Sequence, residues 1–315
     1  KSVTVASADS SLLPMQNKKS PKPNAAGAGQ TKAPAKSSSL SPNAWRVITA
    51  VIALPVIIAS IIIPTLWPLF VALAAAAMLL ALYEYRLLAR KRDMQPDVAV
   101  GILGAAAIFT AFFYDAPSQA PDLLLLTLIL FTIVTFASAA LRGAPFDKMI
   151  ASIGATITSV LYIVLLGGHL VAVRTGFSAQ LSAHLLSFFF LVIMGSDTGA
   201  YYTGRAFGRH KLAPSISPGK TWEGAVGGMV ASLLMAALAH FWFFPELSLK
   251  AALPLAAAMN VIGVIGDLTE SALKRSAGAK DAANILPGHG GLLDRLDSLL
   301  FNAPVIYYFA RMYFK

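Results

Sequence analysis

The residues LPLAAAMNVIGVIG (253–266) run directly into DLTESALKRSAGAKDAANILPGHGGLLDRLD (267–297), and this junction decides how the chain must fold. The first stretch is almost purely apolar, and the chain becomes apolar again from Leu299. Between them lie carboxylates, cations, a histidine and several glycines. Placing charged residues between two segments that are apolar enough to span a membrane costs free energy, so such residues usually have a function. We therefore expect an active site at a membrane surface.

Both ends of the charged stretch are expected to be helical. Asp267, Ser271 and Lys274 then lie on one helix face, at positions i, i+4 and i+7. Asp294 and Asp297, three residues apart, share a face of the next helix. Carboxylates from two helices suit a hard cation such as Mg²⁺, which takes oxygen ligands and usually bridges to substrate phosphates.

Proline and glycine separate these two helices in PGHGG (287–291). Proline stops helical continuation, and the glycines let the backbone turn sharply and present bare N–H groups. Such amides, beside cations, suit a phosphate chain. The cations are Lys274, Arg275, Lys280 and Arg295. The stretch predicts a metal–nucleotide site for phosphoryl or nucleotidyl transfer. The alternative is a solvated loop whose charges pair with one another and set the topology.

Composition indicates an integral membrane protein. The chain is 57% hydrophobic and 13% charged, whereas soluble domains are about 25% charged. Most of its apolar segments approach the roughly 20 residues that a bilayer requires. The nine segments are 47–63, 66–83, 98–114, 122–141, 150–173, 185–203, 224–244, 251–268 and 298–313. We predict an all-α, polytopic helical bundle of about nine transmembrane helices.

The chain divides into three predicted regions. Residues 1–45 are rich in Lys, Ser, Pro, Ala and Gly, cannot bury a core, and are expected to be a disordered basic tail. Residues 46–180 hold the first transmembrane helices, and residues 181–315 form the catalytic transmembrane region. Cysteine is absent from the sequence, which excludes disulfides and thiolate metal sites.

Lysine and arginine predict the orientation of the chain in the membrane. With the tail inside, alternating spans place 21 of the 25 Lys and Arg residues on the inner side. This asymmetry is the positive-inside pattern. The net charge of +10 therefore reflects how the chain is oriented in the membrane, and we expect no nucleic acid partner. The pattern also puts the charged stretch in the cytoplasm, where nucleotides are.

A second polar stretch is GSDTGAYYTGRAFGRHKLAPSISPGKTWEG (195–224). Asp197 lies within an apolar helix, where an ionisable residue is functional by default; the alternative is a structural pair with Arg205 or another cation. Glycines beside Arg205 and Lys220 predict a second phosphate-binding loop. GKT (219–221) is like the end of a P-loop, but residue 214 is proline where that motif requires glycine. We therefore exclude a P-loop.

The first half of the chain offers less chemistry. Glu84, in YEYR (83–86), stands at the predicted cytoplasmic end of the second span. We interpret it as pairing with a neighbouring arginine at the membrane interface.

The pattern SxLKRx₄KDxAx₂LPxHGGLxDRLD (271–297) resembles the signature of the phosphatidate cytidylyltransferase family. DTGAY (197–201) and SPGKTxEG (217–224) resemble the same family upstream of the signature. The likeness covers spans six to nine clearly and the first five only in general character. One departure is Gly219, where many members carry lysine, so that Lys220 alone supplies this charge.

The resemblance implies the reaction CTP + phosphatidate → CDP-diacylglycerol + pyrophosphate. It implies Mg²⁺ held by Asp267 and Asp294, and a second cation such as K⁺. Catalytic candidates are Ser271, Lys274, Arg275, Lys280, Asp281, His289, Arg295 and Asp297. Substrate-binding candidates are Asp197, Arg205, Lys220, Gly290 and Gly291. It also implies a homodimer in a membrane, by default the bacterial inner membrane, with a polar cavity open to the cytosol and to lipid.

Two other classes are weighed against this interpretation. A CTP-dependent polyprenol, dolichol or phytol kinase, or another lipid cytidylyltransferase, shares a membrane nucleotide site but attacks a different phosphorus or lipid. The intact signature argues against the kinases. A transporter predicts charges near the bilayer centre and internal repeats, whereas the charges here cluster at one face.

Overall fold

The computed structural model describes residues 42–143, 146–279 and 291–314, which belong to one compact unit, Leu40–Lys315. The helices are α1 (Pro42–Ile62), α2 (Trp67–Arg90), α3 (Val98–Phe113), α4 (Ala116–Gln119), α5 (Pro121–Leu141), α6 (Met149–Val160), α7 (Leu166–Thr175), α8 (Ala179–Phe207), α9 (Trp222–Trp242), α10 (Leu249–Ser276) and α11 (Leu293–Tyr313). Short 3₁₀ turns, η1 (Pro64–Leu66) and η2 (Phe146–Lys148), precede α2 and α6. A π-helical stretch, η3 (Leu161–Leu165), joins α6 to α7. The predicted helical bundle is confirmed.

Each predicted apolar segment falls on a helix or on a continuous run of helices. Within the described part of the chain, six stretches are long and apolar enough to cross a membrane: Pro64–Arg90, Pro121–Leu141, Phe146–Thr175, Ala179–Phe207, Trp222–Trp242 and Leu249–Ser276. Val51–Ile62 and Val98–Phe113 are shorter apolar helices. The count of nine spans stays a prediction.

Helix ends follow local sequence signals. Prolines stand in the first turns of α2 and α5, where an N–H has no intrahelical partner. Asp97 caps α3 by accepting a hydrogen bond from the Val100 N–H (3.1 Å). Thr221 caps α9 in the same way through the Gly224 N–H (3.1 Å).

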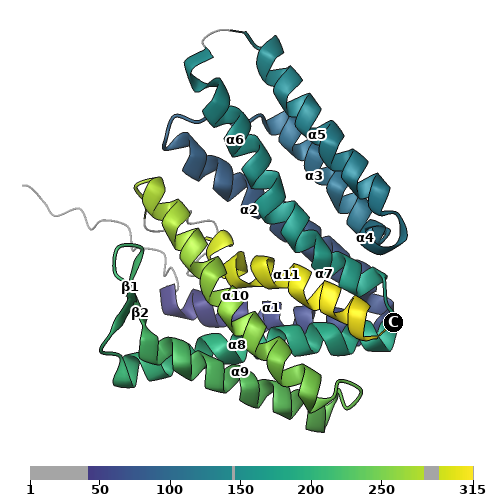
Figure 1. The fold of residues 1–315 in the computed structure, drawn as a ribbon, viewed down its shortest axis with the longest axis vertical. Coiled ribbons are helices and arrows are strands. Elements are labelled where there is room, and N and C mark those ends of the chain that lie inside the picture. The colour runs from purple at the N-terminus through teal and green to yellow at the C-terminus, as the bar shows by residue number, and fades with distance from the viewer. Residues whose placement is uncertain (1–41, 144–145, 280–290, 315) are drawn as a thin grey trace, which may run out of the picture. The chain divides into compact units, whose positions relative to one another are not determined.

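Helices α8 and α9 lie side by side, with α10 crossing close to them (Figure 1). Small residues permit the close approach of α8 and α9. A Cβ added to Gly199 would lie 2.9 Å from the Gly227 carbonyl oxygen, which is closer than packing allows. The first half of the chain packs on this region, since α2 and α7 both contact α11.

A short β-hairpin connects α8 to α9, and the sequence did not predict it. Strand β1 (Lys211–Ala213) pairs antiparallel with β2 (Ser217–Thr221), and Lys211 is opposite Thr221. The Trp222 N–H donates to the His210 carbonyl oxygen (2.9 Å), so the hairpin closes directly onto the start of α9. The predicted second phosphate-binding loop is this hairpin.

Candidate active site

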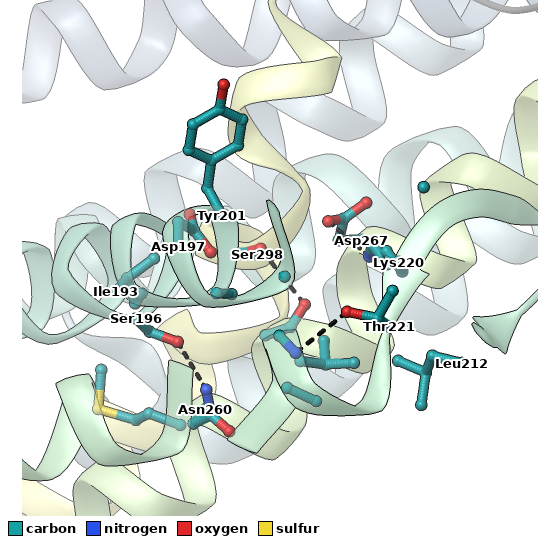
Figure 2. Close-up of a pocket in the computed structure, with 18 of the residues that line it drawn as sticks. Ile193, Ser196, Asp197, Tyr201, Leu212, Lys220, Thr221, Asn260, Asp267 and Ser298 are labelled. Carbon is teal, nitrogen blue, oxygen red and sulfur yellow. Dashed lines mark hydrogen bonds and ion pairs between the residues drawn. The ribbon is translucent and has the colours of Figure 1, made fainter. Parts of the chain in front are cut away.

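A polar pocket of about 420 Å³ lies where α8, α9, α10, α11 and the hairpin meet (Figure 2). The polar side chains that line it are Ser196, Asp197, Tyr201, Arg205, Lys220, Thr221, Asn260, Asp267, Ser298 and Asn302. The pocket thus draws on the stretch 195–224 and, from the described part of the stretch 267–297, on Asp267. Residues about seventy positions apart come together there because α10 packs against α8 and α9 and contacts β2.

The spacing of these residues along their helices directs their side chains into the pocket. On α10, Asn260, Gly263 and Asp267 are separated by three and four residues and therefore lie along one face. Ser298 and Asn302 of α11 follow the same spacing. The deep end is polar as well, since the Asn260 amide donates to the Ser196 hydroxyl (2.6 Å).

Lys220 and Asp267 form an ion pair in the pocket, with 2.5 Å between the ammonium nitrogen and a carboxylate oxygen. Lys220 is the penultimate residue of β2, and the next residue, Thr221, is anchored as the cap of α9. The hairpin therefore holds the ammonium group over the carboxylate.

Two further carboxylates lie near this pair. Asp197 and Asp297 both interact electrostatically with Asp267 and with Lys220. Asp297 also accepts a hydrogen bond from the Ser298 N–H (2.6 Å). The Arg205 guanidinium donates to the Tyr201 hydroxyl (3.0 Å). Asp197 lines the pocket and interacts with Lys220, so both its functional role and the alternative, a structural pair with a cation, stay predictions.

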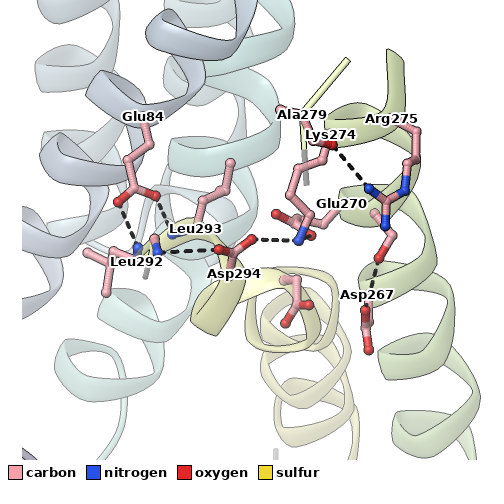
Figure 3. A network of polar contacts seen from close by, with 12 residues as sticks. Glu84, Asp267, Glu270, Lys274, Arg275, Ala279, Leu292, Leu293 and Asp294 are labelled. Carbon is pink, nitrogen blue, oxygen red and sulfur yellow. Dashed lines mark hydrogen bonds and ion pairs between the residues drawn. The ribbon is translucent and has the colours of Figure 1, made fainter. Parts of the chain in front are cut away.

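A second cluster surrounds Lys274 (Figure 3). Its ammonium nitrogen lies 2.6 Å from carboxylate oxygens of both Glu270 and Asp294. The other Asp294 oxygen accepts from the Gly291 N–H (3.3 Å). Burial acts to raise the pKa of Asp294, but its hydrogen bonds with Glu270 and Lys274 outweigh burial and hold that pKa below its usual value.

Glu270 is a residue that the sequence interpretation missed. Its side chain is only 1% exposed, and it precedes Lys274 by four residues. The spacing itself was a signal, because glutamate and lysine at i and i+4 meet on a helix surface.

The predicted face of α10 is confirmed. The Ser271 hydroxyl donates to the Asp267 carboxylate (3.4 Å), and Lys274 follows one turn later. The next residue, Arg275, points to different partners and donates to the carbonyl oxygens of Ile216 (3.3 Å) and Ala279 (3.3 Å). The tip of the hairpin is thereby tied to the end of α10.

The remaining predicted residues divide into two groups. Arg295 lies in the first turn of α11, beside Asp294. Lys280, Asp281, His289 and Gly290 lie outside the described residues. Their roles stay predictions.

The interpretation of Glu84 as an interfacial partner of arginine is wrong. Glu84 is fully buried, and its two carboxylate oxygens accept the N–H groups of Leu292 and Leu293, each at 2.7 Å (Figure 3). Because these amides open α11, Glu84 serves as the cap of that helix from a distance.

The donor set of the pocket suits a hard divalent cation. Among the described residues, no three His, Asp or Glu side chains are grouped to hold a metal by themselves. Mg²⁺, however, is usually bound through one or two carboxylates together with substrate phosphates. Asp267 lines the pocket and Asp294 belongs to the Lys274 cluster, and each presents such oxygens beside a lysine that can pair with phosphate instead.

Comparison with known proteins agrees with this geometry. The model of the Cytidylyltransferase family matches residues 44–313. Proteins named phosphatidate cytidylyltransferase are 34% identical over 262 residues in Staphylococcus haemolyticus and 35% identical over 268 residues in Pseudomonas aeruginosa. These alignments cover 83% and 82% of this chain, and 96% and 94% of the two relatives.

A protein of the same name from Haemophilus influenzae is 45% identical over 129 residues, which are 40% of this chain and 45% of the relative. The matches therefore extend from a strongly similar part to nearly the full length of the relatives. The chain belongs to the cytidylyltransferase family and is a membrane-embedded nucleotidyltransferase.

Proposed function

We propose that the pocket between α8, α9, α10 and α11 is where this chain carries out the phosphatidate cytidylyltransferase reaction, CTP + phosphatidate → CDP-diacylglycerol + pyrophosphate. One observation carries the assignment of the site. The two polar stretches of the sequence meet in one pocket, where Lys220 and Asp267 form an ion pair beside Asp197. Alternating carboxylates and ammonium groups suit a metal-bound polyphosphate.

The chemistry requires positioning more than proton transfer. A phosphatidate oxygen attacks the α-phosphorus of CTP, a new P–O bond forms, and the bond to the bridging oxygen of pyrophosphate breaks. The attacking oxygen is already anionic at neutral pH, so a strong general base is unnecessary. The chain's task is to bring two anions together and to stabilise the charge that develops on the leaving group.

Lysines and arginines supply this stabilisation. Lys220 approaches from the hairpin and Lys274 from α10, so the two ammonium groups come from different elements. Arg205, Arg275 and Arg295 add positive charge around them, and Ser271 offers a hydroxyl to a phosphate oxygen. Gly291 donates its N–H to Asp294. Lys280, Asp281, His289 and Gly290 lie outside the described residues, and we propose for them the roles that the sequence predicts, further charge and further backbone amides.

A divalent cation is usually needed by cytidylyltransferases, and we propose Mg²⁺, with K⁺ as a second cation. Asp267 and Asp294 are the proposed ligands, and Asp197 and Asp297, whose charges interact with Asp267 and Lys220, are proposed to orient Lys220. When bound, the metal neutralises phosphate charge and polarises the α-phosphoryl group. The lysines that pair with these carboxylates are then available to substrate oxygens.

We also propose that the site faces the cytoplasm of a bacterial inner membrane and that the chain forms a homodimer. The orientation rests on the Lys and Arg distribution and on the need for CTP. Phosphatidate would reach the pocket from the lipid side.

The test follows label from each phosphate of CTP. Purified protein in detergent is given phosphatidate and CTP labelled at either the α- or the γ-phosphate, with and without Mg²⁺. We expect lipid-extractable label only from the α-phosphate, with release of pyrophosphate. Asp267→Asn should reduce this transfer by about a hundredfold. Asp147→Asn, which removes an exposed carboxylate in η2, is the matched control and should retain wild-type activity.

Other outcomes identify the alternatives. Transfer of the γ-label to a polyprenol would make the chain a kinase. Absence of any transfer to phosphatidate or to a polyprenol, under every metal tried, would contradict the enzymatic function and favour a transporter.

A further inference from the structure

The buried carboxylate of Glu84 joins two parts of the chain that are 208 residues apart. Glu84 belongs to α2, in the first half, and its two oxygens accept the N–H groups of Leu292 and Leu293, each at 2.7 Å. The residue at the N-cap of α11, Leu292, has no side-chain oxygen with which to cap the helix. Glu84 therefore provides the acceptor oxygens that a local Ser or Asp ordinarily provides at the start of a helix.

A second contact from the same end of α2 has the opposite sign. Arg92, two residues beyond α2, donates its Nε–H to the carbonyl oxygen of Ser276. Ser276 is the last residue of α10, so a cation meets the negative end of that helix. The acidic side chain of Glu84 contacts the start of α11, and the basic side chain of Arg92 contacts the end of α10. This is the arrangement that the two helix dipoles favour.

Both contacts lie close to the Lys274 cluster. Lys274 precedes Ser276 by two residues, and Asp294 directly follows Leu293. The 2.6 Å ion pair between Lys274 and Asp294 therefore has the Glu84 contact on its α11 side (Figure 3) and the Arg92 contact on its α10 side. A shift of either helix end would change that distance, because the anchored residues lie within one turn of the paired ones.

Burial explains why the Glu84 contact is strong. A carboxylate at 0% exposure is costly unless its oxygens are bonded, and here both oxygens accept short backbone hydrogen bonds. An ordinary helix could be capped by one serine at far lower cost. A buried carboxylate that is contributed by another helix is expected where the position of the capped helix matters for function.

We propose that Glu84 and Arg92 form a brace on α2 that positions the ends of α10 and α11, and with them Lys274 and Asp294, for catalysis. The inference rests on the proposed function, and it makes the first half of the chain a contributor to the site in the second half. Glu84 carries most of the effect, because Arg92 is exposed and its contact is weakened by water.

The principal variant is Glu84→Gln. Glutamine keeps the shape but turns one acceptor into a donor, which then faces a backbone N–H. We expect kcat/KM for CTP to fall by about a hundredfold, the effect of displacing reacting groups by roughly 1 Å. Arg92→Gln should cause a smaller loss, and the double variant should lose less than the product of the two single losses, because both act on one ion pair.

A second readout does not depend on catalysis. The chain contains no cysteine, so Ala279→Cys introduces a unique thiol three residues after Ser276. We expect maleimide to label this thiol several-fold faster in the Glu84→Gln background, while the folded fraction, measured by size-exclusion chromatography in detergent, is unchanged. Asp93→Asn, an exposed carboxylate in the same connection, is the matched control and should leave both readouts at the wild-type value.

The outcomes separate the brace from the proposed reaction. Unchanged labelling and unchanged kcat/KM in Glu84→Gln, or a loss of activity equal to the loss of folded protein, would overturn the brace. Failure of the wild-type chain to label phosphatidate would contradict the proposed function, while the thiol readout would still decide the brace. If Glu84→Gln does not fold, Arg92→Gln alone decides it, and wild-type values for both readouts overturn it.

Discussion

The ammonium group of Lys220 lies 2.5 Å from a carboxylate oxygen of Asp267, although the two residues belong to different elements, a β-hairpin and a long membrane helix. Each group is only partly exposed, at 22% and 38% for the two side chains. In the pocket, Asp267 can exchange Lys220 for a bound cation, and Lys220 can exchange Asp267 for a phosphate. Each group then keeps a partner of opposite charge. This exchange is the physical basis of the function proposed above.

Replacing Lys220 tests the exchange directly. Lys220→Met retains the length of the side chain and removes its charge, so that Asp267 loses its partner and the phosphate loses a cation. We expect kcat/KM for CTP to fall by about a hundredfold in the radiolabel assay. Lys211→Met, on the exposed face of the same hairpin, should remain near wild type. Equal losses in the two variants would mean that the hairpin acts only by its overall charge.

Glu270 should contribute to stability as well as to activity. Its side chain is 1% exposed and lies 2.6 Å from Lys274. Glu270→Leu removes both oxygens and leaves the buried ammonium with Asp294 alone, and we expect the free energy of unfolding to fall by about 3 kcal/mol. Thermal unfolding in detergent measures the change. Glu246→Gln, which removes an exposed partner of His184, should cost less than about 0.5 kcal/mol. A small loss for both variants would contradict a strong Glu270–Lys274 pair.

Asp97 should make stability depend on pH in the acid range. Burial acts to raise its pKa, but hydrogen bonds from Ser138 and the Val100 N–H, with Arg142 at 3.4 Å, hold the pKa below the usual 3.8. A carboxylate with a lowered pKa in the folded state stabilises the fold above the unfolded pKa. That stabilisation disappears as the pH falls through the folded value.

The comparison of wild type with Asp97→Asn isolates this effect. Asparagine can still cap α3, but it loses the charge that strengthens the hydrogen bonds from Ser138 and the Val100 N–H. We therefore expect the variant to be about 1 kcal/mol less stable at neutral pH, and the difference in Tm to shrink as the pH falls below about 4. A difference that stays constant across this range would show that the charge of Asp97 is not responsible.

Replacing glycine by alanine should have opposite effects on stability at two positions, Gly199 in the contact between α8 and α9, and Gly154 on α6. In Gly199→Ala the new methyl group meets the Gly227 carbonyl oxygen at 2.9 Å, so the helices must separate, and we expect a loss of about 1–3 kcal/mol. In Gly154→Ala on α6 the methyl group enters open space, and better helix propensity should raise stability by up to about 1 kcal/mol. Thermal unfolding of both variants in one detergent provides the measurement, and a loss at Gly154 would refute the packing argument.

Much of this molecule follows from its sequence. The runs of apolar residues predicted the long helical segments, though not the short α4, because a membrane span must satisfy its backbone hydrogen bonds internally and therefore must be helical over its length. Spacing alone also predicted the face shared by Asp267, Ser271 and Lys274, since the helix of α10 continues to Ser276.

Other features could not be predicted from local patterns. The strands of the hairpin are three and five residues long and include Pro218, which is unfavourable in most strands. Their pairing depends on the ends of α8 and α9 being close. Glu84 resembled an interfacial acid because its neighbour in sequence is Tyr85-Arg86, whereas its partners are 208 and 209 residues away.

The sequence by itself determined the all-helical membrane class, the helical segments and the residue types of a metal–nucleotide site, because these depend on periods and compositions within a few turns. Tertiary structure alone decided which distant groups meet: Lys220 with Asp267, Lys274 with Asp294, and Glu84 with the start of α11. The physical reason is that a charge below a membrane surface must find its partner wherever helix packing brings one, and packing depends on contacts between residues far apart in the chain.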